Sequence, residues 1–116
     1  MPRYLLSVWH DDDYDIDFST PEAERIVMQV SKFNADLQLA DAMVFGCGLL
    51  PASQAAVVRS GEAAADWQSG AYSTAPEQMG GFWVLEAADD ATARDWAERA
   101  AAACEGPVEL RPLQGG

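Results

Sequence analysis

Two strand-like segments of this chain carry apolar side chains on both faces, and this restricts how the sheet they form can be covered. Successive side chains of a strand point to opposite faces. On residues 3–10, the two faces are Tyr4, Leu6 and Val8 on one side and Leu5 and Trp9 on the other. Residues 82–86 alternate in the same way, with Phe82 and Val84 opposite Trp83 and Leu85. Such a sheet needs a cover on each side.

Caps and apolar stripes predict two helices. Thr20 and Pro21 have the form of an N-cap followed by proline at the first helical position. The apolar stripe of this helix is Ile26, Val30, Phe33, Leu37 and Ala40. Asp89 or Asp90 caps the second helix, which is expected to stop at 106–107. Its stripe is Ala93, Trp96, Ala97, Ala100 and Cys104. Each stripe can cover one side of a sheet.

Besides residues 3–10, short apolar or alternating runs predict four further strands. They are residues 43–50, 55–59, 82–86 and 108–112, of which 55–59 is expected to return antiparallel to 43–50. Residues 60–80 lack sustained periodicity and are predicted to form a long loop. Apart from that loop and one extra strand, the order is β-α-β-β-α-β, which predicts an α+β fold of ferredoxin-like type, with an antiparallel sheet and both helices on one face.

One domain over residues 1–116 is expected, and it is expected to pair with itself. Two helices cover only one face of the sheet, which leaves a large apolar patch on the other face. We therefore expect a homodimer in which two such sheets pack face to face, forming a dimeric α+β barrel.

The charge and the apolar content restrict which partners and which cellular compartment can be expected. Seven Lys and Arg against nineteen Asp and Glu give a net charge of −12, which disfavours nucleic acid and anionic membranes. There is no apolar run of the roughly 20 residues that cross a bilayer and no signal-peptide pattern, so a cytoplasmic protein is expected. Cys47 and Cys104 are expected to be buried, reduced thiols, with a disulfide or metal role as the alternative.

Several short motifs in a fixed order resemble the YCII-related family, and in particular its DGPF subgroup. They are Tyr4-Leu5-Leu6, residues 48–51 (GLLP), 55–59 (AAVVR), 77–83 (EQMGGFW), Trp96-Ala97 and residues 108–113 (VELRPL). The resemblance implies a ferredoxin-like fold, a dimeric α+β barrel, a bacterial origin and a small-molecule or enzymatic role. Where the subgroup carries Asp-Gly-Pro-Phe, residues 69–72 read SGAY, so Ser69 replaces the signature aspartate.

His10 is the candidate catalytic residue because every histidine-based mechanism must use the one histidine. The resemblance suggests a His-Asp pair, and Asp12 lies on the same side of an extended strand as His10. A neighbouring carboxylate favours the imidazolium, as a general acid near neutral pH requires. The alternatives are a solvated histidine at a strand end and a metal ligand.

The acidic run after His10 matches the pattern of a calcium-binding loop only in part. Asp11, Asp13, Asp15, Asp17 and Glu22 fall at the positions of an EF-hand. Ile16 stands where the motif needs glycine, and a strand rather than a helix precedes the run. A solvated acidic loop is therefore favoured, and no metal or cofactor is expected.

Arg59, Ser69 and Tyr72 are the candidate ligand-binding residues. The guanidinium of Arg59 or Arg111 can hold an anionic group, although an internal ion pair is the alternative. Tyr72 can stack on a ligand or simply pack. We expect a small-molecule-binding homodimer, with His10 as general acid or base if it is an enzyme. A non-catalytic binding or regulatory module and a cofactor-independent, monooxygenase-like barrel are the alternatives.

Overall fold

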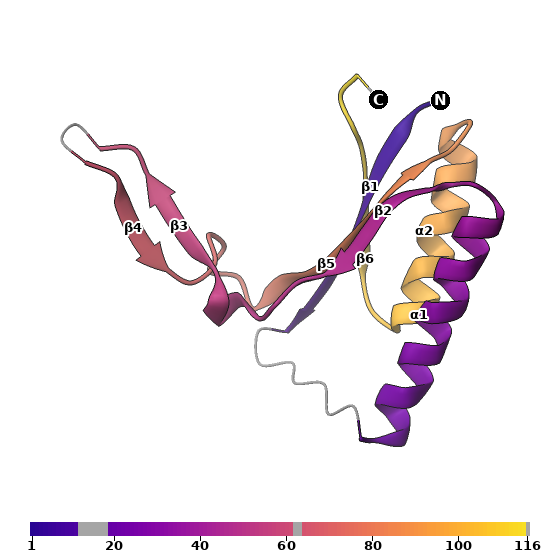
Figure 1. Cartoon of the computed structure of the whole chain (residues 1–116), viewed down its shortest axis with the longest axis horizontal. Coiled ribbons are helices and arrows are strands. Elements are labelled where there is room, and N and C mark those ends of the chain that lie inside the picture. The colour runs from indigo at the N-terminus through magenta and orange to yellow at the C-terminus, as the bar shows by residue number, and fades with distance from the viewer. Residues whose placement is uncertain (12–18, 62–63, 116) are drawn as a thin grey trace.

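A computed structural model describes residues 1–11, 19–61 and 64–115, which form an α+β fold (Figure 1). In chain order its elements are β1 (Arg3–Asp11), α1 (Pro21–Leu39), β2 (Met43–Gly48), η1 (Ala52–Gln54), β3 (Ala56–Arg59), β4 (Asp66–Ser69), β5 (Glu77–Glu86), α2 (Asp90–Cys104) and β6 (Val108–Pro112).

Four of the strands form an antiparallel sheet in the order β2-β5-β1-β6. Both helices lie on one side of this sheet (Figure 1). This arrangement is consistent with the predicted ferredoxin-like fold. The predicted strand at residues 108–112 is present as β6, which lies at the edge of the sheet and pairs with β1.

The core lies between this sheet and the two helices. Leu6, Leu37 and Leu85 are fully buried there. The ring of Phe33 meets that of Trp83 edge-on at 5.0 Å between centroids, a favourable geometry for aromatic pairs. The Trp83 indole Nε1 donates a hydrogen bond of 2.8 Å to Asn34 Oδ1, which satisfies the polar end of the ring. The predicted alternation of apolar residues along the strands is thus confirmed on this face.

The helix starts follow the predicted caps, whereas the helix ends differ. Thr20 Oγ1 accepts from the Ala23 amide at 3.2 Å, and an Asp89 carboxylate oxygen accepts from the Thr92 amide at 2.8 Å. Ala40 was wrongly predicted to lie on the apolar stripe, since α1 has ended there and the residue is exposed. At the end of α2, Glu105 rather than a glycine takes the left-handed conformation, with φ of 55°.

The predicted pairing of residues 55–59 and the predicted loop over 60–80 are both wrong in part. β3 pairs with β4, not β2, and the two form a separate two-stranded sheet with Val58 opposite Trp67. We call this hairpin, residues 56–69, the arm. β5 also begins at Glu77, before the glycine pair. The sequence does not indicate this hairpin clearly. Both of its strands are mostly exposed, so they show no alternation of apolar and polar residues.

The face of the sheet opposite the helices has no second layer over it among the described residues. We call it the open face; its apolar side chains include Leu5, Trp9, Phe45, Phe82 and Val84. Phe45 is 55% exposed, and its ring lies 5.9 Å from that of Phe82. The molecule is 19 Å deep along its shortest axis, which is roughly two layers of secondary structure.

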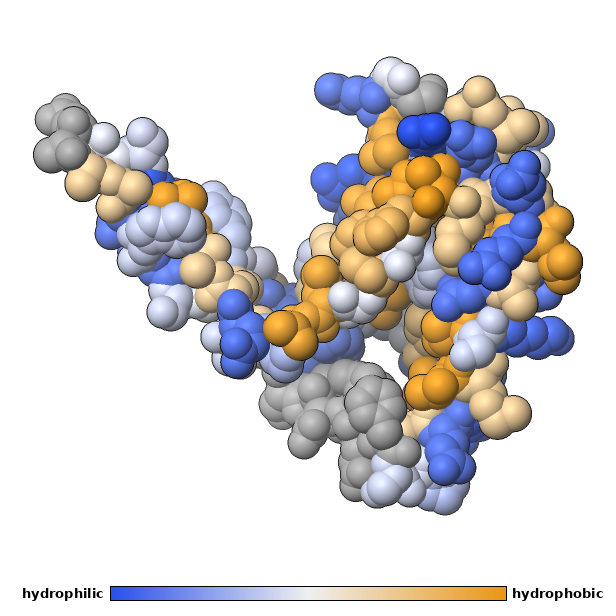
Figure 2. Space-filling view, in the orientation of Figure 1, coloured by the Kyte–Doolittle hydropathy of each residue, from blue (hydrophilic) through white to orange (hydrophobic). Residues whose placement is uncertain are grey.

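The arm projects from the sheet on the side away from the helices (Figure 1). A gap separates it from the main body in the space-filling view (Figure 2). The radius of gyration is accordingly 16.2 Å, whereas a compact chain of this length has about 13 Å.

Candidate functional site

The first candidate site is a cavity of about 860 Å³ between α1 and the end of the sheet where β2 stops and β5 starts. Its apolar wall on the helix side comes from Ile26, Val27 and Val30. His10 and Trp83 border it from the sheet. We call it the His10 cavity.

The cavity exists because glycines occupy this end of the sheet. Gly48 pairs with Gly81 and Gly46 with Trp83, so three of these four positions carry no side chain. A Cβ at Gly46 would strike the Trp83 ring. Near the other end of the same strands, the fully buried Leu85 fills the corresponding space against the helices. The sheet therefore presents mainly backbone to the N-terminal half of α1.

The position of His10 depends on an irregularity in β5. Val8 pairs with Gly81 and Trp9 with Met79, so Gly80 is an extra residue on β5. The His10 ring lies over this residue, and a Cβ at position 80 would overlap its Nε2 and Cδ2 atoms. Only glycine leaves room for the imidazole in this place.

The hydrogen bonding of His10 fixes which nitrogen carries the proton. Nδ1 lies 3.0 Å from the backbone oxygen of Asp11. A carbonyl oxygen only accepts, so Nδ1 donates, and in the neutral ring the lone pair is on Nε2. The half-buried imidazole borders the cavity with one nitrogen already oriented by the backbone.

The cavity is electrostatically negative on balance. Asp11 and Glu77 lie opposite each other across β1 and β5, and both are exposed near the cavity. Glu105 also borders it, but it forms a salt bridge of 2.9 Å with Arg25. This hydrogen-bonded pair lowers the pKa of Glu105 and raises that of Arg25. The described residues that line the cavity include no Lys or Arg.

The two cysteines differ from each other and in part from the prediction. Both are free thiols. Cys47 is exposed, so its predicted burial is wrong, because its side chain is on the open face with Phe82. Cys104 is half-buried beside the cavity, and burial raises the pKa of its thiol.

The structure of one chain brings only part of the predicted site together. His10 borders the cavity, whereas Asp12 lies outside the described residues. Arg59 and Ser69 lie on the arm and Tyr72 follows it, and none of the three is among the described lining residues. The Arg59 guanidinium lies 5.5 Å from the centre of the Tyr72 ring. Their predicted ligand role therefore has no support within a single chain.

Arg111 and the acidic run after His10 were the other candidates for binding an anion or a metal ion. Arg111 forms an internal ion pair, the alternative to a ligand role, at 2.8 Å from Glu109. Most of the acidic run compared with a calcium loop lies outside the described residues. Within residues 1–11, 19–61 and 64–115, no three His, Cys, Asp or Glu side chains gather as a metal site would require.

Sequence reasoning missed the residues that shape the cavity. The sequence patterns assign no role to Gly80, Gly81 or Glu105. A double glycine within an otherwise bulky strand was the available signal, since glycine in a strand often marks a bulge or a close approach. The contact of Glu105 with Arg25 joins residues 80 apart in sequence, so no local pattern indicates it.

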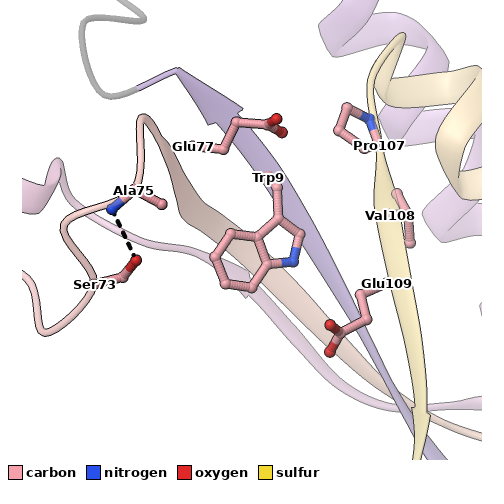
Figure 3. Close-up of a pocket in the computed structure, with 7 residues that line it drawn as sticks. All are labelled: Trp9, Ser73, Ala75, Glu77, Pro107, Val108 and Glu109. Carbon is pink, nitrogen blue, oxygen red and sulfur yellow. Dashed lines mark hydrogen bonds between the residues drawn. The ribbon is translucent and has the colours of Figure 1, made fainter.

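A second, shallow depression of about 530 Å³ lies around Trp9 (Figure 3). The carboxylates of Glu77 and Glu109 flank the indole ring. Trp9 Nε1 donates to Ser7 Oγ at 2.9 Å, so the polar end of the ring is satisfied within β1. The depression is open, and it belongs to the same face of the sheet as Leu5 and Phe82.

Comparison with known proteins gives one family. The model of the YCII-related domain matches residues 5–114. No curated protein matches the chain. Among the described residues, neither helix combines the length and the apolar character needed to cross a membrane.

Proposed function

Because this chain belongs to the YCII-related domain family, we propose that it is a homodimer that binds a small, uncharged molecule in the His10 cavity. The single observation that carries this proposal is the His10 imidazole, held over Gly80 at the edge of a largely apolar cavity. The DGPF subgroup is part of the proposal, and residues 77–83 (EQMGGFW) support it.

The size and lining of the cavity favour an apolar ligand without negative charge. Its volume of about 860 Å³ lies within the roughly 300–1,000 Å³ of ligand pockets. Ile26, Val27 and Val30 supply an apolar wall. Asp11 and Glu77 repel an anion, and no described lining residue carries a compensating positive charge.

His10 provides the polar contact and the means of proton transfer. Nε2 of the neutral ring can accept a hydrogen bond from a ligand O–H group, because Nδ1 carries the proton. In the catalytic form of the proposal, Nε2 takes a proton from an O–H or acidic C–H bond of the ligand. The ligand keeps the electron pair, and the imidazolium later returns the proton. The Asp11 carbonyl orients the ring and stabilises the imidazolium by accepting from Nδ1.

The homodimer is supported by the open face of the sheet. A monomer exposes Phe45 to water and leaves Phe82 and its apolar neighbours only partly buried, and apolar patches of this kind mark interaction sites. Two copies placed face to face would cover both patches at once.

Three matched probes test the ligand class: phenol, toluene and benzoate. Their affinities are measured by the chemical-shift changes they cause in the protein near neutral pH. We expect phenol to bind most tightly, because it is neutral and offers a donor to Nε2, and benzoate to bind most weakly. The variant His10→Phe keeps a ring but removes the nitrogen, so it should lose the preference for phenol over toluene. Glu109→Gln, which lies outside the cavity, serves as the control.

Two results would refute the proposal. One is tighter binding of benzoate than of phenol. The other is an unchanged preference for phenol over toluene in His10→Phe.

A further inference from the structure

We propose that the arm docks on a second copy of this chain, so that each subunit holds its partner with both its open face and its arm. This inference rests on the homodimer of the proposed function. It adds a contact that face-to-face packing of the sheets does not require, and it assigns a role to residues 56–69.

The arm needs a surface that its own chain does not provide. A two-stranded hairpin is at best marginally stable alone in water. All four residues of β4 are exposed, and so are three of the four residues of β3. Val58 and Trp67 face each other on one side of the hairpin, and Trp67 is 65% exposed. An apolar pair in this position is available for a partner.

The arm and the open face lie on the same side of the molecule. The helices cover the opposite side of the sheet, and the arm leans away from them (Figure 1). The space-filling view shows the hollow between arm and body (Figure 2). A second copy placed against the open face would therefore lie within reach of the arm.

The sheet alone offers a small flat area for an interface. Its four strands contain five to ten residues each. With a rise of about 3.3 Å per residue and a strand spacing of about 4.8 Å, their flat footprint is roughly 500 Å². Stable interfaces bury about 800 Å² of accessible surface per partner, and the exposed side chains of the arm enlarge the apolar surface available for such a contact.

Charge also favours this surface over the rest of the molecule. Two copies with a net charge of −12 each repel one another, so their contact has to avoid unpaired carboxylates. On the sheet, Glu109 is paired with Arg111 and Glu86 with Arg3. On the arm, Arg59 stands opposite Asp66. Most of the charge on the surfaces that would meet is thus paired, although Glu77, beside Trp9, has no ion pair among the described residues.

A symmetric pair uses the contact twice. In a two-fold dimer, any surface that one copy offers to its partner is offered in return. Each arm would then reach across to the other subunit, and the two arms together would hold the sheets in register.

The first test removes the arm. The Gly70 amide donates to the Ala55 carbonyl at 2.7 Å, so the two ends of the arm are adjacent. Residues 56–69 can therefore be replaced by an Asn-Gly turn without moving the rest of the chain. Sedimentation equilibrium is expected to show a dimer dissociation constant raised at least tenfold, as loss of several interface side chains implies. Circular dichroism checks that the shortened chain is folded.

A second test uses substitutions on the two faces of the hairpin. Trp67→Ser combined with Val58→Ser is expected to raise the dissociation constant by tenfold or more. Gln68→Ser lies on the opposite face of the same hairpin and is the matched control. In the wild-type protein, the backbone amides of the arm should also exchange hydrogen more slowly at dimer-forming concentrations than after dilution.

The possible outcomes separate this inference from the homodimer itself. If the shortened chain and the double variant form dimers as tightly as the wild type, the inference is wrong and the homodimer stands. If the wild type is monomeric at about 100 µM, a concentration well above the micromolar range of specific association, both are wrong. A monomeric wild type with a dimeric shortened chain would mean that the arm folds back over its own sheet.

Discussion

At the scale of single residues, the site depends on the absence of a side chain at Gly80. His10 is oriented by a backbone carbonyl on one side and by the absence of a side chain at Gly80 on the other. The orientation of the imidazole therefore depends in part on backbone geometry, which the bulge in β5 creates.

Gly80→Ala is expected to displace the His10 ring and weaken phenol binding at least tenfold. Its Cβ would occupy the place of the imidazole, and crowding of this kind costs about 1–3 kcal/mol of stability. Nitrogen-15 spectra report the ring directly, since this chain has one histidine. Gly48→Ala is the control for the ring signals alone: it also lies in the cavity wall, but its Cβ would have the Gly80 oxygen at 3.8 Å as its nearest neighbour, an ordinary contact. Unchanged imidazole signals in Gly80→Ala would contradict this account.

At the scale of elements, α1 packs through a narrow stripe and not through its whole surface. Leu37 is fully buried, while Leu39, two residues later, is 86% exposed. The apolar residues of its N-terminal half instead border the His10 cavity. The C-terminal half of α1 therefore packs in the core, and its N-terminal half lines the candidate site.

Leu37→Ala and Leu39→Ala should therefore differ in stability although both remove the same atoms from the same helix. The first is expected to lower the free energy of unfolding by about 2–5 kcal/mol, because it leaves a cavity in the core. The second should change it by less than about 0.5 kcal/mol. Urea unfolding measures both, and similar losses in the two variants would contradict the placement of α1.

The Arg25–Glu105 pair fastens the start of α1 to the end of α2 and makes this contact dependent on pH. The pKa of Glu105 is lower in the folded chain than its ordinary value of 4.5, mainly because Arg25 donates to its carboxylate. As the pH falls, the unfolded chain therefore binds this proton first, and the contribution to stability is lost. At neutral pH the contribution is fully present.

Glu105→Gln provides the test of this contact. The wild type should be more stable than the variant at about pH 7, and the difference should shrink as the pH is lowered to about 3. Urea unfolding of both proteins across this range gives the difference directly. A difference that is independent of pH would show that the ion pair does not stabilise the folded chain.

At the scale of the whole molecule, strong negative charge and an apolar open face act in opposite directions. The net charge of −12 separates two copies, whereas the uncovered apolar side chains favour their association. Their balance depends on the salt concentration, because salt screens the charges and leaves the apolar contact in place.

The dimer is therefore expected to tighten as salt is added. Between about 0.01 M and 1 M ionic strength, the screening length falls from about 30 Å to about 3 Å. We expect the dissociation constant from sedimentation equilibrium to fall at least tenfold over this range, while the affinity for uncharged phenol stays nearly constant. A dimer that weakens with salt would instead be held by ion pairs.

The sequence by itself determined the elements whose signals are local. Thr20 and Asp89 mark where the helices begin, and strict alternation marks β1, the second half of β5 and β6. It also predicted two apolar faces, because the period of a strand assigns each side chain to a face without any knowledge of its neighbours. His10 was identified because it is the one histidine in the sequence.

Only the tertiary structure decided the cavity, the role of Gly80 and the arm. Glycines on β2 and β5 make a hollow when the two strands pair in one register, and His10 meets Gly80 only because β5 bulges. The strand at residues 56–59 was predicted, but β4 is exposed along its whole length, so no alternation marks it as the partner of β3. These features arise from contacts between distant residues, and such contacts leave no period in the sequence.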